Sequence, residues 1–315
     1  MTSIIKELKP KLTGFLHLDG KGIKIKGKNK KGLTLFIAQD SKGLPIHQDL
    51  MDGENKLAIM NFLDSLNKDL YYHPQGIISD MKEEIIQAVK EKMPQIPHQF
   101  CLTHILRGID RVVRYQAYYT QASRLLKRLK SLRSIFIYPY LNKKERIVSE
   151  CRQLKQKLKA LKIKYKPQLL ARRYLRIYVL SNTIQKAEQR LQRIKKLRTK
   201  FKQQKKIFNH IGLLIKYKDN IFCHLNHTYM PYTNNTLENL IKQYERRLKT
   251  IEGFGNNQDI IKGYLNLMAI CYCFKSYTDC KKNNKYKNGK SPLEVAGVFT
   301  KSLDWVRYSY KTSNN

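Results

Sequence analysis

The sequence predicts a mixed α/β core that is interrupted by a large, basic, all-helical insertion. Strand-like runs alternate with helix-like periods over residues 1–104, whereas heptad-like apolar spacing and excess positive charge mark the middle of the chain. Of the 315 residues, 42% are hydrophobic and 27% are charged, so the chain can bury a core. We expect 1–104 to begin this core, 105–232 to form the insertion, and 233–315 to complete the core with helices.

Residues 1–104 are expected to contain five strands and two helices. The strands are expected over residues 14–25, 33–39, 44–50, 75–79 and 98–102, and the helices over 56–70 and 82–92. The Lys26–Gly32 run is turn-like and separates the first two strands. Apolar residues from Ile59 to Leu70 recur at spacings of 4, 3 and 4, which places them on one helical face. Pro94 ends the second helix.

The middle segment is expected to form long helices that pack through a narrow apolar seam. Apolar residues recur at spacings of 4, 3, 4 and 3 from Ile147 to Leu161, and at 3, 4 and 3 from Ile184 to Ile194. The other faces carry mostly Lys, Arg and Gln. An antiparallel helical hairpin without any partner is the alternative interpretation of this pattern.

The last segment is also expected to be helical. The Thr233–Asn235 run can cap a helix that continues to about Ile251. An apolar helix is expected over residues 260–274, and Ser291 to Glu294 form a capping-box pattern that starts a short helix. We expect Lys281–Lys290 to be a surface loop.

The charge distribution indicates a polyanionic partner. The chain has 62 Lys and Arg against 24 Asp and Glu, and residues 105–210 hold 31 of the basic residues but only 4 acidic ones. Such a one-signed segment is typical of a phosphate-contacting surface, so nucleic acid is the leading partner. An anionic membrane surface is second, but no lipidation motif, amphipathic anchor or 18-residue apolar run supports it. The N-terminus has no apolar signal core, and six unevenly spaced Cys fit reduced thiols inside a cell.

Two aspartates follow or lie in strand-like runs, and each has an ordinary interpretation beside a functional one. Asp19 precedes Gly20, which is typical of a hairpin turn, and this interpretation is favoured for Asp19 taken alone. Asp80 precedes a helix, with Glu83 three residues later, which is typical of a helix cap. The functional alternative for both is a metal-binding carboxylate near the end of a strand, where open α/β sheets place their sites.

Glu238 lies in the first turn of its expected helix, where the helix dipole favours a carboxylate. Lys242, Arg246 and Lys249 follow on the same face. The ordinary interpretation is a solvated face. The functional one is a third acidic ligand, with the basic residues binding DNA phosphates.

Cys101 and His104 form a Cys-x-x-His pair, which is at most half of a zinc site. Further ligands could come from other Cys and His residues, although none has a standard zinc spacing: Cys223, His224, His227, Cys271 and Cys273. A core Cys beside a hydrogen-bonded His is the favoured alternative. The chain has no phosphate-binding Gly-rich loop, which disfavours a nucleotide-driven enzyme.

In this order, the motifs resemble those of the Mutator-like DDE transposases of bacterial and archaeal insertion sequences. The motifs are Leu-Asp-Gly at 18–20, Ile-Ile-Ser-Asp at 77–80, Cys-Leu-Thr-His at 101–104 and, after the helical segment, Thr-Asn-Asn-Thr-Leu-Glu-Asn at 233–239. The resemblance covers about residues 14–300 and implies a ribonuclease H-like core that an all-α insertion interrupts. It implies a catalytic and metal-binding triad of Asp19, Asp80 and Glu238, with a supportive role for Cys101 and His104.

The resemblance implies metal-dependent DNA cleavage and strand transfer. Two Mg²⁺ or Mn²⁺ ions, about 4 Å apart, would stabilise the attacking and leaving oxygens at phosphorus. The implied partners are the double-stranded DNA of the transposon ends and target, bound by a homodimer in the nucleoid region of a prokaryotic cytoplasm. A non-catalytic DNA-binding remnant and a ribonuclease H-like nuclease are the alternatives. Only 13 residues precede the first expected strand, so we expect either a shortened copy or site recognition by the insertion.

Overall fold

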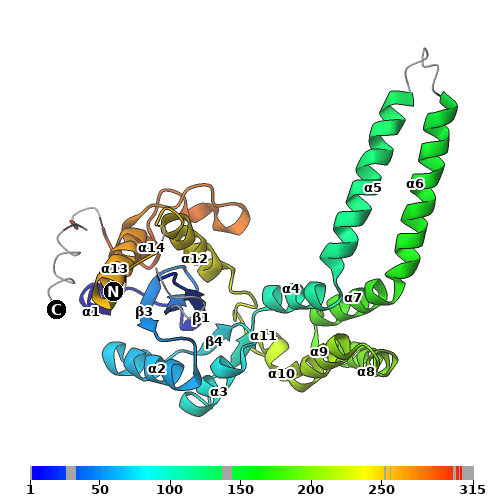
Figure 1. The fold of residues 1–315 in the computed structure, drawn as a ribbon. Coiled ribbons are helices and arrows are strands. Elements are labelled where there is room, and N and C mark those ends of the chain that lie inside the picture. The colour runs from blue at the N-terminus through cyan, green and yellow to red at the C-terminus, as the bar shows by residue number, and fades with distance from the viewer. Residues whose placement is uncertain are drawn as a thin grey trace. The chain divides into compact units, whose positions relative to one another are not determined.

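The computed structural model describes residues 2–25, 33–136, 144–251, 253–255, 257–300, 303–304 and 306. The chain forms two compact units, which are described separately. One unit combines residues 1–103 with 226–315, and the other comprises residues 104–225. The first unit contains both strands and helices, and the second is helical (Figure 1). The turn expected at Lys26–Gly32 lies outside the described residues.

The α/β unit is built around a five-stranded mixed sheet. Its strands are β1 (Phe15–Gly22), β2 (Thr34–Asp40), β3 (Pro45–Met51), β4 (Gly76–Ser79) and β5 (His98–Phe100), in the spatial order β3-β2-β1-β4-β5. The first three strands are antiparallel neighbours, whereas β4 and β5 run parallel to β1. The carboxyl ends of β1, β4 and β5 therefore meet at one edge of the sheet.

Helices cover both faces of the sheet. They are α1 (Thr2–Leu8), α2 (Lys56–Leu70), α3 (Glu83–Lys92), α12 (Asn235–Leu248), α13 (Gln258–Phe274) and α14 (Pro292–Val295). Helices α2 and α3 lie on one side of the sheet, and α12 and α13 lie on the other (Figure 1). All seven residues of β2 are buried, as expected for a central strand that is covered on both faces.

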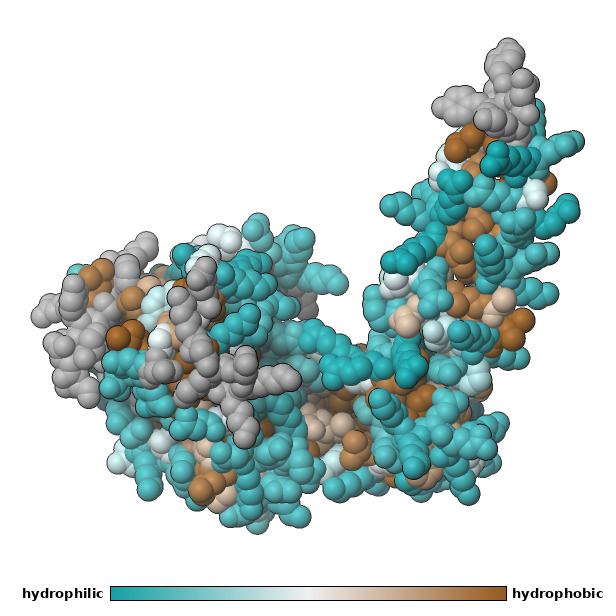
Figure 2. Space-filling view, in the orientation of Figure 1, coloured by the Kyte–Doolittle hydropathy of each residue, from teal (hydrophilic) through white to brown (hydrophobic). Residues whose placement is uncertain are grey.

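The helical unit contains a long antiparallel pair and a group of shorter helices. Its elements are α4 (Leu102–Val112), α5 (Tyr115–Phe136), α6 (Lys144–Lys164), α7 (Lys166–Val179), α8 (Ile184–Lys200), α9 (Lys205–Lys216), α10 (Lys218–Ile221) and α11 (Cys223–Asn226). Leu129 and Leu132 of α5 pack against Ile147 and Leu154 of α6. Figure 2 shows this seam as a narrow apolar stripe between hydrophilic side chains on both helices.

The base of the long pair is fixed by a few charged contacts. Arg172 Nε donates to Asp110 Oδ1 at 2.7 Å, and its guanidinium lies 3.6 Å from the ring centroid of Tyr115. Arg176 also contacts the Asp110 carboxylate, at 3.5 Å. Asp110 is one of four acidic residues in 105–210, so the 31 basic residues of this segment far outnumber its acidic ones.

Several expected elements end at different residues in the structure. β1 ends at Gly22 rather than at Ile25, which forms only an isolated bridge with Phe254. β5 ends at Phe100 because α4 already begins at Leu102. The expected loop over residues 281–290 instead contains the 3-10 helix η1 (Lys282–Lys287).

Candidate functional site

Asp19 lies in the middle of a strand and not in a turn. It pairs with Ile37 of β2, so the favoured hairpin interpretation of its Asp-Gly sequence is wrong. The side chains of His17, Asp19 and Lys21 point to the same face because they are two residues apart in β1. His17 contacts Asn234 at the start of α12, and Lys21 contacts Glu245 within this helix, so Asp19 between them also faces α12. Its side chain is only 9% exposed.

Asp80 directly follows β4, next to Asp19. The parallel register pairs His17 with Ile78, and its continuation by two residues places Asp19 opposite Asp80. The interpretation of Asp80 as a helix cap is also wrong, since α3 begins at Glu83 and its N-cap residue is Lys82. Burial, and next the negative charge of Asp80, raise the pKa of the Asp19 carboxyl from 3.8 to about 7. The two carboxylates therefore form one electrostatic unit.

Glu238 is buried, not solvated, at the first turn of α12. Its side chain is 10% exposed, and Lys242 Nζ lies 3.9 Å from its Oε2. Asn234, one turn before it, bonds to Leu18, and Glu245, two turns after it, forms an ion pair with Lys21. Because these contacts lie on either side of Glu238, the residue lies alongside the part of β1 that contains Asp19.

Asn234 connects the start of α12 to β1 through a buried hydrogen-bond network. Its Nδ2 donates to the Leu18 carbonyl at 3.0 Å, and its Oδ1 lies 2.8 Å from His17 Nδ1. The other ring nitrogen of His17 lies 2.9 Å from Ser41 Oγ. Burial lowers the pKa of His17 to about 4, so the ring is neutral and its Nδ1–H can donate to Asn234. Asn234 is the N-cap residue of α12, but its side chain enters this network and does not cap the helix.

Cys101, which directly follows β5, supports the same network. The Asn234 backbone N–H donates to Cys101 Sγ at 3.1 Å, and Cys101 N donates to the Ser79 carbonyl at 2.7 Å. Cys101 is completely buried, while its motif partner His104 lies in the first turn of α4. This arrangement agrees with the interpretation of Cys101 as a core residue.

Within the described residues, one group of three side chains could ligate a metal ion at short range. Ligand atoms of Cys101, His104 and Glu238 lie within 4.8 Å of one another. Asp19 and Asp80 are not part of this compact group. Cys223 is buried, and Cys271 and Cys273 are, respectively, exposed and buried on α13, without joining such a group. The structure thus brings Asp19 and Asp80 together and places Glu238 on the same side of β1, next to Cys101.

Two further charged residues, which the sequence did not reveal, lie beside the aspartates. Glu54 is in the loop before α2, and it forms an ion pair with Lys82 in the loop after β4. The charges of both residues act on the Asp19 carboxyl. The sequence contains a weak signal only for Glu54, and this signal is the glycine next to Asp19. A Cβ at residue 20 would lie 2.8 Å from the Glu54 carboxylate, so the glycine leaves room for this side chain.

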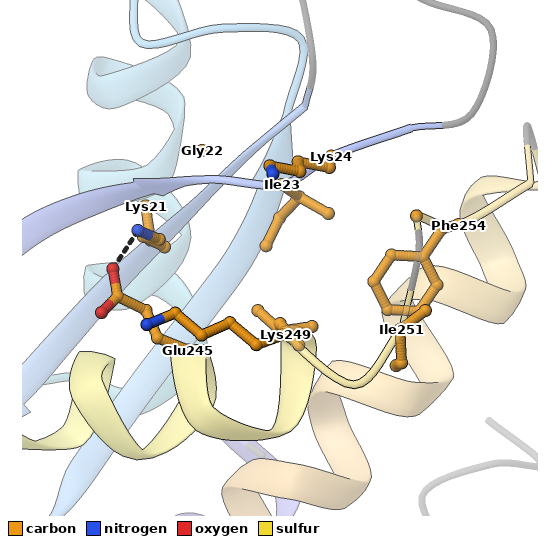
Figure 3. A pocket seen from close by; sticks show the side chains of 10 residues that line it. Lys21, Gly22, Ile23, Lys24, Glu245, Lys249, Ile251 and Phe254 are labelled. Atoms are coloured by element: carbon orange, nitrogen blue, oxygen red, sulfur yellow. Dashed lines mark hydrogen bonds and ion pairs between the residues drawn. The ribbon is translucent and has the colours of Figure 1, made fainter.

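The basic residues predicted to bind DNA are all exposed on α12. Lys242, Arg246 and Lys249 form one accessible row on that helix. Lys249 also lines a pocket of about 310 Å³ beyond the end of β1, together with Lys21, Lys24 and Phe254 (Figure 3). In this pocket Lys21 is paired with Glu245, as the dashed line in Figure 3 indicates. The pocket combines cationic and aromatic side chains, and both kinds can contact a DNA strand.

The donor atoms near Asp19 fit a hard divalent cation. Carboxylate oxygens are the preferred protein ligands of Mg²⁺ and Mn²⁺. The Glu54 Oε1 atom is buried and has no hydrogen-bond partner among the described residues, as expected for an oxygen that a cation could satisfy. The neighbouring carboxylates of Asp19 and Asp80 also repel each other, and a cation would relieve this repulsion.

Comparisons with protein families identify two matching segments. A family model described as "Transposase IS66 family" matches residues 87–260, and one described as "MULE transposase domain" matches residues 26–108. No curated protein matches the chain. Across the described residues, we find no helix whose length and apolar character would let it cross a membrane. The longer match covers more than half of the chain and includes Cys101, His104 and Glu238.

Proposed function

Because the chain belongs to the transposase IS66 family, we propose that it cuts and joins DNA with Asp19, Asp80 and Glu238 as its catalytic carboxylates. The observation that carries this proposal is the placement of the three acids. Asp19 lies in β1, Asp80 directly follows the neighbouring strand β4, and Glu238 is buried on the helix that packs against the same face of β1. An ordinary folding role does not require two buried acids and a partly buried third around one strand.

The topology of the sheet supports a ribonuclease H-like core. Three antiparallel strands are followed by two parallel ones in the order β3-β2-β1-β4-β5, with helices on both faces. The match of residues 26–108 to the MULE transposase domain supports a Mutator-like relationship for this part of the chain. Residues 104–225 form a separate compact unit, as an insertion into such a core would.

Asp19, Asp80 and Glu238 would hold two divalent cations. When bound, Mg²⁺ or Mn²⁺ supplies charge stabilisation for the oxygens around the reacting phosphorus. The protein contributes carboxylates whose positions are fixed before DNA binds, because Asn234 ties α12 to β1. Burial of Asp19 also limits the access of bulk water to the site.

The proposed reaction is phosphodiester hydrolysis followed by strand transfer. In the first step a water oxygen bonds to phosphorus and the bond from phosphorus to O3′ breaks. In the net reaction the water supplies the oxygen of the new 5′-phosphate and the proton of the freed 3′-hydroxyl. In the second step this 3′-oxygen bonds to a target phosphorus, and the target's own O3′ leaves with the displaced proton.

Double-stranded DNA would be bound mainly by the basic insertion. Residues 105–210 carry 31 basic and 4 acidic side chains, and hydrophilic side chains line both helices of the α5–α6 pair (Figure 2). Lys242, Arg246 and Lys249 would hold phosphates close to the acids. Since a transposon has two ends, we propose that two copies of the chain act together on DNA.

Nicking of a labelled duplex tests this function. The wild-type chain is expected to nick DNA in Mg²⁺, whereas Asp80→Ala should cut at least a hundredfold more slowly while its gel-shift affinity at fixed salt stays unchanged. The matched control is Asp64→Ala, which removes an aspartate that pairs with Lys92 in the same unit, away from the site. Equal cutting by the wild type and Asp80→Ala would show that Asp80 is not catalytic. DNA binding without any cutting by the wild type would indicate a non-catalytic remnant.

A further inference from the structure

We propose that Glu54 is a fourth metal-binding carboxylate beside Asp19 and Asp80, and that Lys82 takes the place of the cation in the metal-free protein. This inference rests on the proposed function, because it presupposes a divalent cation at Asp19 and Asp80. It adds to that site a residue from another loop. Glu54 lies outside the three motifs that contain Asp19, Asp80 and Glu238.

The first observation is that Glu54 approaches β1 where the strand lacks a side chain. The Glu54 carboxylate lies so close to Gly20 that a Cβ there would be 2.8 Å from its Cδ and Oε2 atoms. Real Cβ atoms essentially never come so close to another heavy atom. The backbone of Gly20 does not have a positive φ, so its conformation does not require a glycine. A Cβ at residue 20 would therefore force the Glu54 carboxylate to move, so this carboxylate occupies the space that the missing side chain leaves beside β1.

The second observation is the unequal exposure of the Glu54–Lys82 ion pair. The Glu54 side chain is 14% exposed and that of Lys82 is 41% exposed. One oxygen of Glu54 contacts Lys82, while Oε1 is buried without a hydrogen-bond partner among the described residues. A surface ion pair does not usually leave a carboxylate oxygen buried and unsatisfied. The Lys82 ammonium group therefore binds one of the two oxygens of Glu54 and leaves the other able to bind a cation.

The third observation is that the charges of the whole group act on one another. Asp80 and Asp19 both act on the Lys82 ammonium in addition to Glu54, and Asp80 also acts on Glu54. Lys82 thus contacts Glu54 directly, and the charges of Asp80 and Asp19 act on it as well. A divalent cation has the same sign and more charge, so it would compete with Lys82 for these oxygens.

Lys82 has a route out of the site. It lies in the loop between Asp80 and the start of α3, and its half-exposed side chain can turn toward solvent. The Glu54 side chain is more deeply buried and packs beside Gly20. Metal binding should therefore release Lys82 and keep Glu54 in place.

Mn²⁺ binding to the full chain, measured without DNA from the electron paramagnetic resonance signal of free Mn²⁺, tests this inference. Lys82→Gln should bind Mn²⁺ several-fold more tightly, because a competing cation is removed. Glu54→Gln should bind it about tenfold more weakly, the loss typical for a ligand or its direct support. Gly20→Ala should also weaken binding, because the new methyl group displaces the Glu54 carboxylate without removing its charge.

The decisive comparison places Glu54→Gln in the Lys82→Gln background. If Glu54 ligates the metal, this double variant should still bind Mn²⁺ about tenfold more weakly than Lys82→Gln alone. If Glu54 acts only by neutralising Lys82, the two affinities should agree within twofold, and the inference is then overturned. Lys56→Gln and Glu91→Gln are matched controls, since these residues form a Lys–Glu ion pair at 2.5 Å with 42% and 51% exposure.

Asp80→Asn separates this inference from the proposed function. If Asp80→Asn binds Mn²⁺ as the wild type does, the metal site at Asp19 and Asp80 is wrong, and the role of Glu54 is rejected with it. If Asp80→Asn loses Mn²⁺ binding but Glu54→Gln has no effect in the Lys82→Gln background, only the role of Glu54 is wrong. Circular dichroism of each variant verifies that it is folded, and Gly20→Ala provides a second test should Glu54→Gln not fold.

Discussion

Asn234 is predicted to hold the catalytic acids in position, and Asn234→Ala removes this function without touching an acid. The substitution leaves the Leu18 carbonyl and the His17 Nδ1–H without their side-chain partner in a buried environment. Each unsatisfied buried group costs about 1–3 kcal/mol, so with two such groups the opening of the β1–α12 contact should become easier by about 2–6 kcal/mol. The backbone contact from Asn234 to Cys101 Sγ does not depend on the side chain and should remain.

Hydrogen–deuterium exchange of peptides from β1 and α12 measures this opening free energy. Asn239→Ala is the matched control, because Asn239 lies in the same helix and the same sequence motif but is exposed. A cycle with His17→Ala should give a coupling of about 1–2 kcal/mol between residues 17 and 234. DNA nicking by Asn234→Ala should fall while its DNA affinity stays unchanged. The reasoning is refuted if Asn234→Ala costs no more than Asn239→Ala, or if the two substitutions of the cycle are additive.

Two further predictions concern charge. The folded pKa of Asp19 is raised from 3.8 to about 7, so the metal-free chain loses stability as pH rises between these values, by about 4 kcal/mol in total. Asp19→Asn should therefore be more stable than the wild type at pH 8 without metal, with the difference vanishing near pH 4 in urea unfolding; equal stability at pH 8 would argue against a buried, charged Asp19. DNA affinity should fall steeply with salt, because about thirty Lys and Arg in residues 105–210 can displace counterions. Deletion of 105–210 should remove most of the binding in a gel-shift titration, whereas affinity that is insensitive to salt would exclude a phosphate-contacting insertion.

Sequence patterns were sufficient for elements that a local signal defines. The helix expected over 56–70 has the same bounds in the structure, because its apolar face is regular and Asn55 caps it through a hydrogen bond to Ala58 N. The capping box at Ser291 and Glu294 is confirmed as well. Both features depend on residues no more than four positions apart, so the sequence alone contains the information.

Patterns were insufficient where distant residues decide a local structure. The Asp-Gly pair at 19 and 20 favours a turn by itself, but β2 and β4 pair with this segment on both sides and keep it extended. The side chain of Asn234 was expected to help cap its helix, yet His17 and Leu18 offer it a buried network instead.

The surroundings of the candidate site were least predictable. Glu54 is 35 positions from Asp19, and its loop has no motif that relates it to the strand. Only the fold brings its carboxylate to Gly20 and Lys82. The roles of Asp19, Asp80 and Glu238 themselves came from the order of motifs, and they stay predictions.

Anomalous diffraction from crystals of the full chain soaked in Mn²⁺ tests the central claim most directly. We predict a manganese peak within ligand distance of the Asp19 and Asp80 carboxylates, with Glu238 turned toward it, and no such peak in crystals of Asp80→Asn. The contrary result would be crystals that show no manganese at Asp19 and Asp80 but bind a zinc ion between Cys101, His104 and Glu238. The acids would then not form a site for hard divalent cations, and the proposed cleavage chemistry would be wrong.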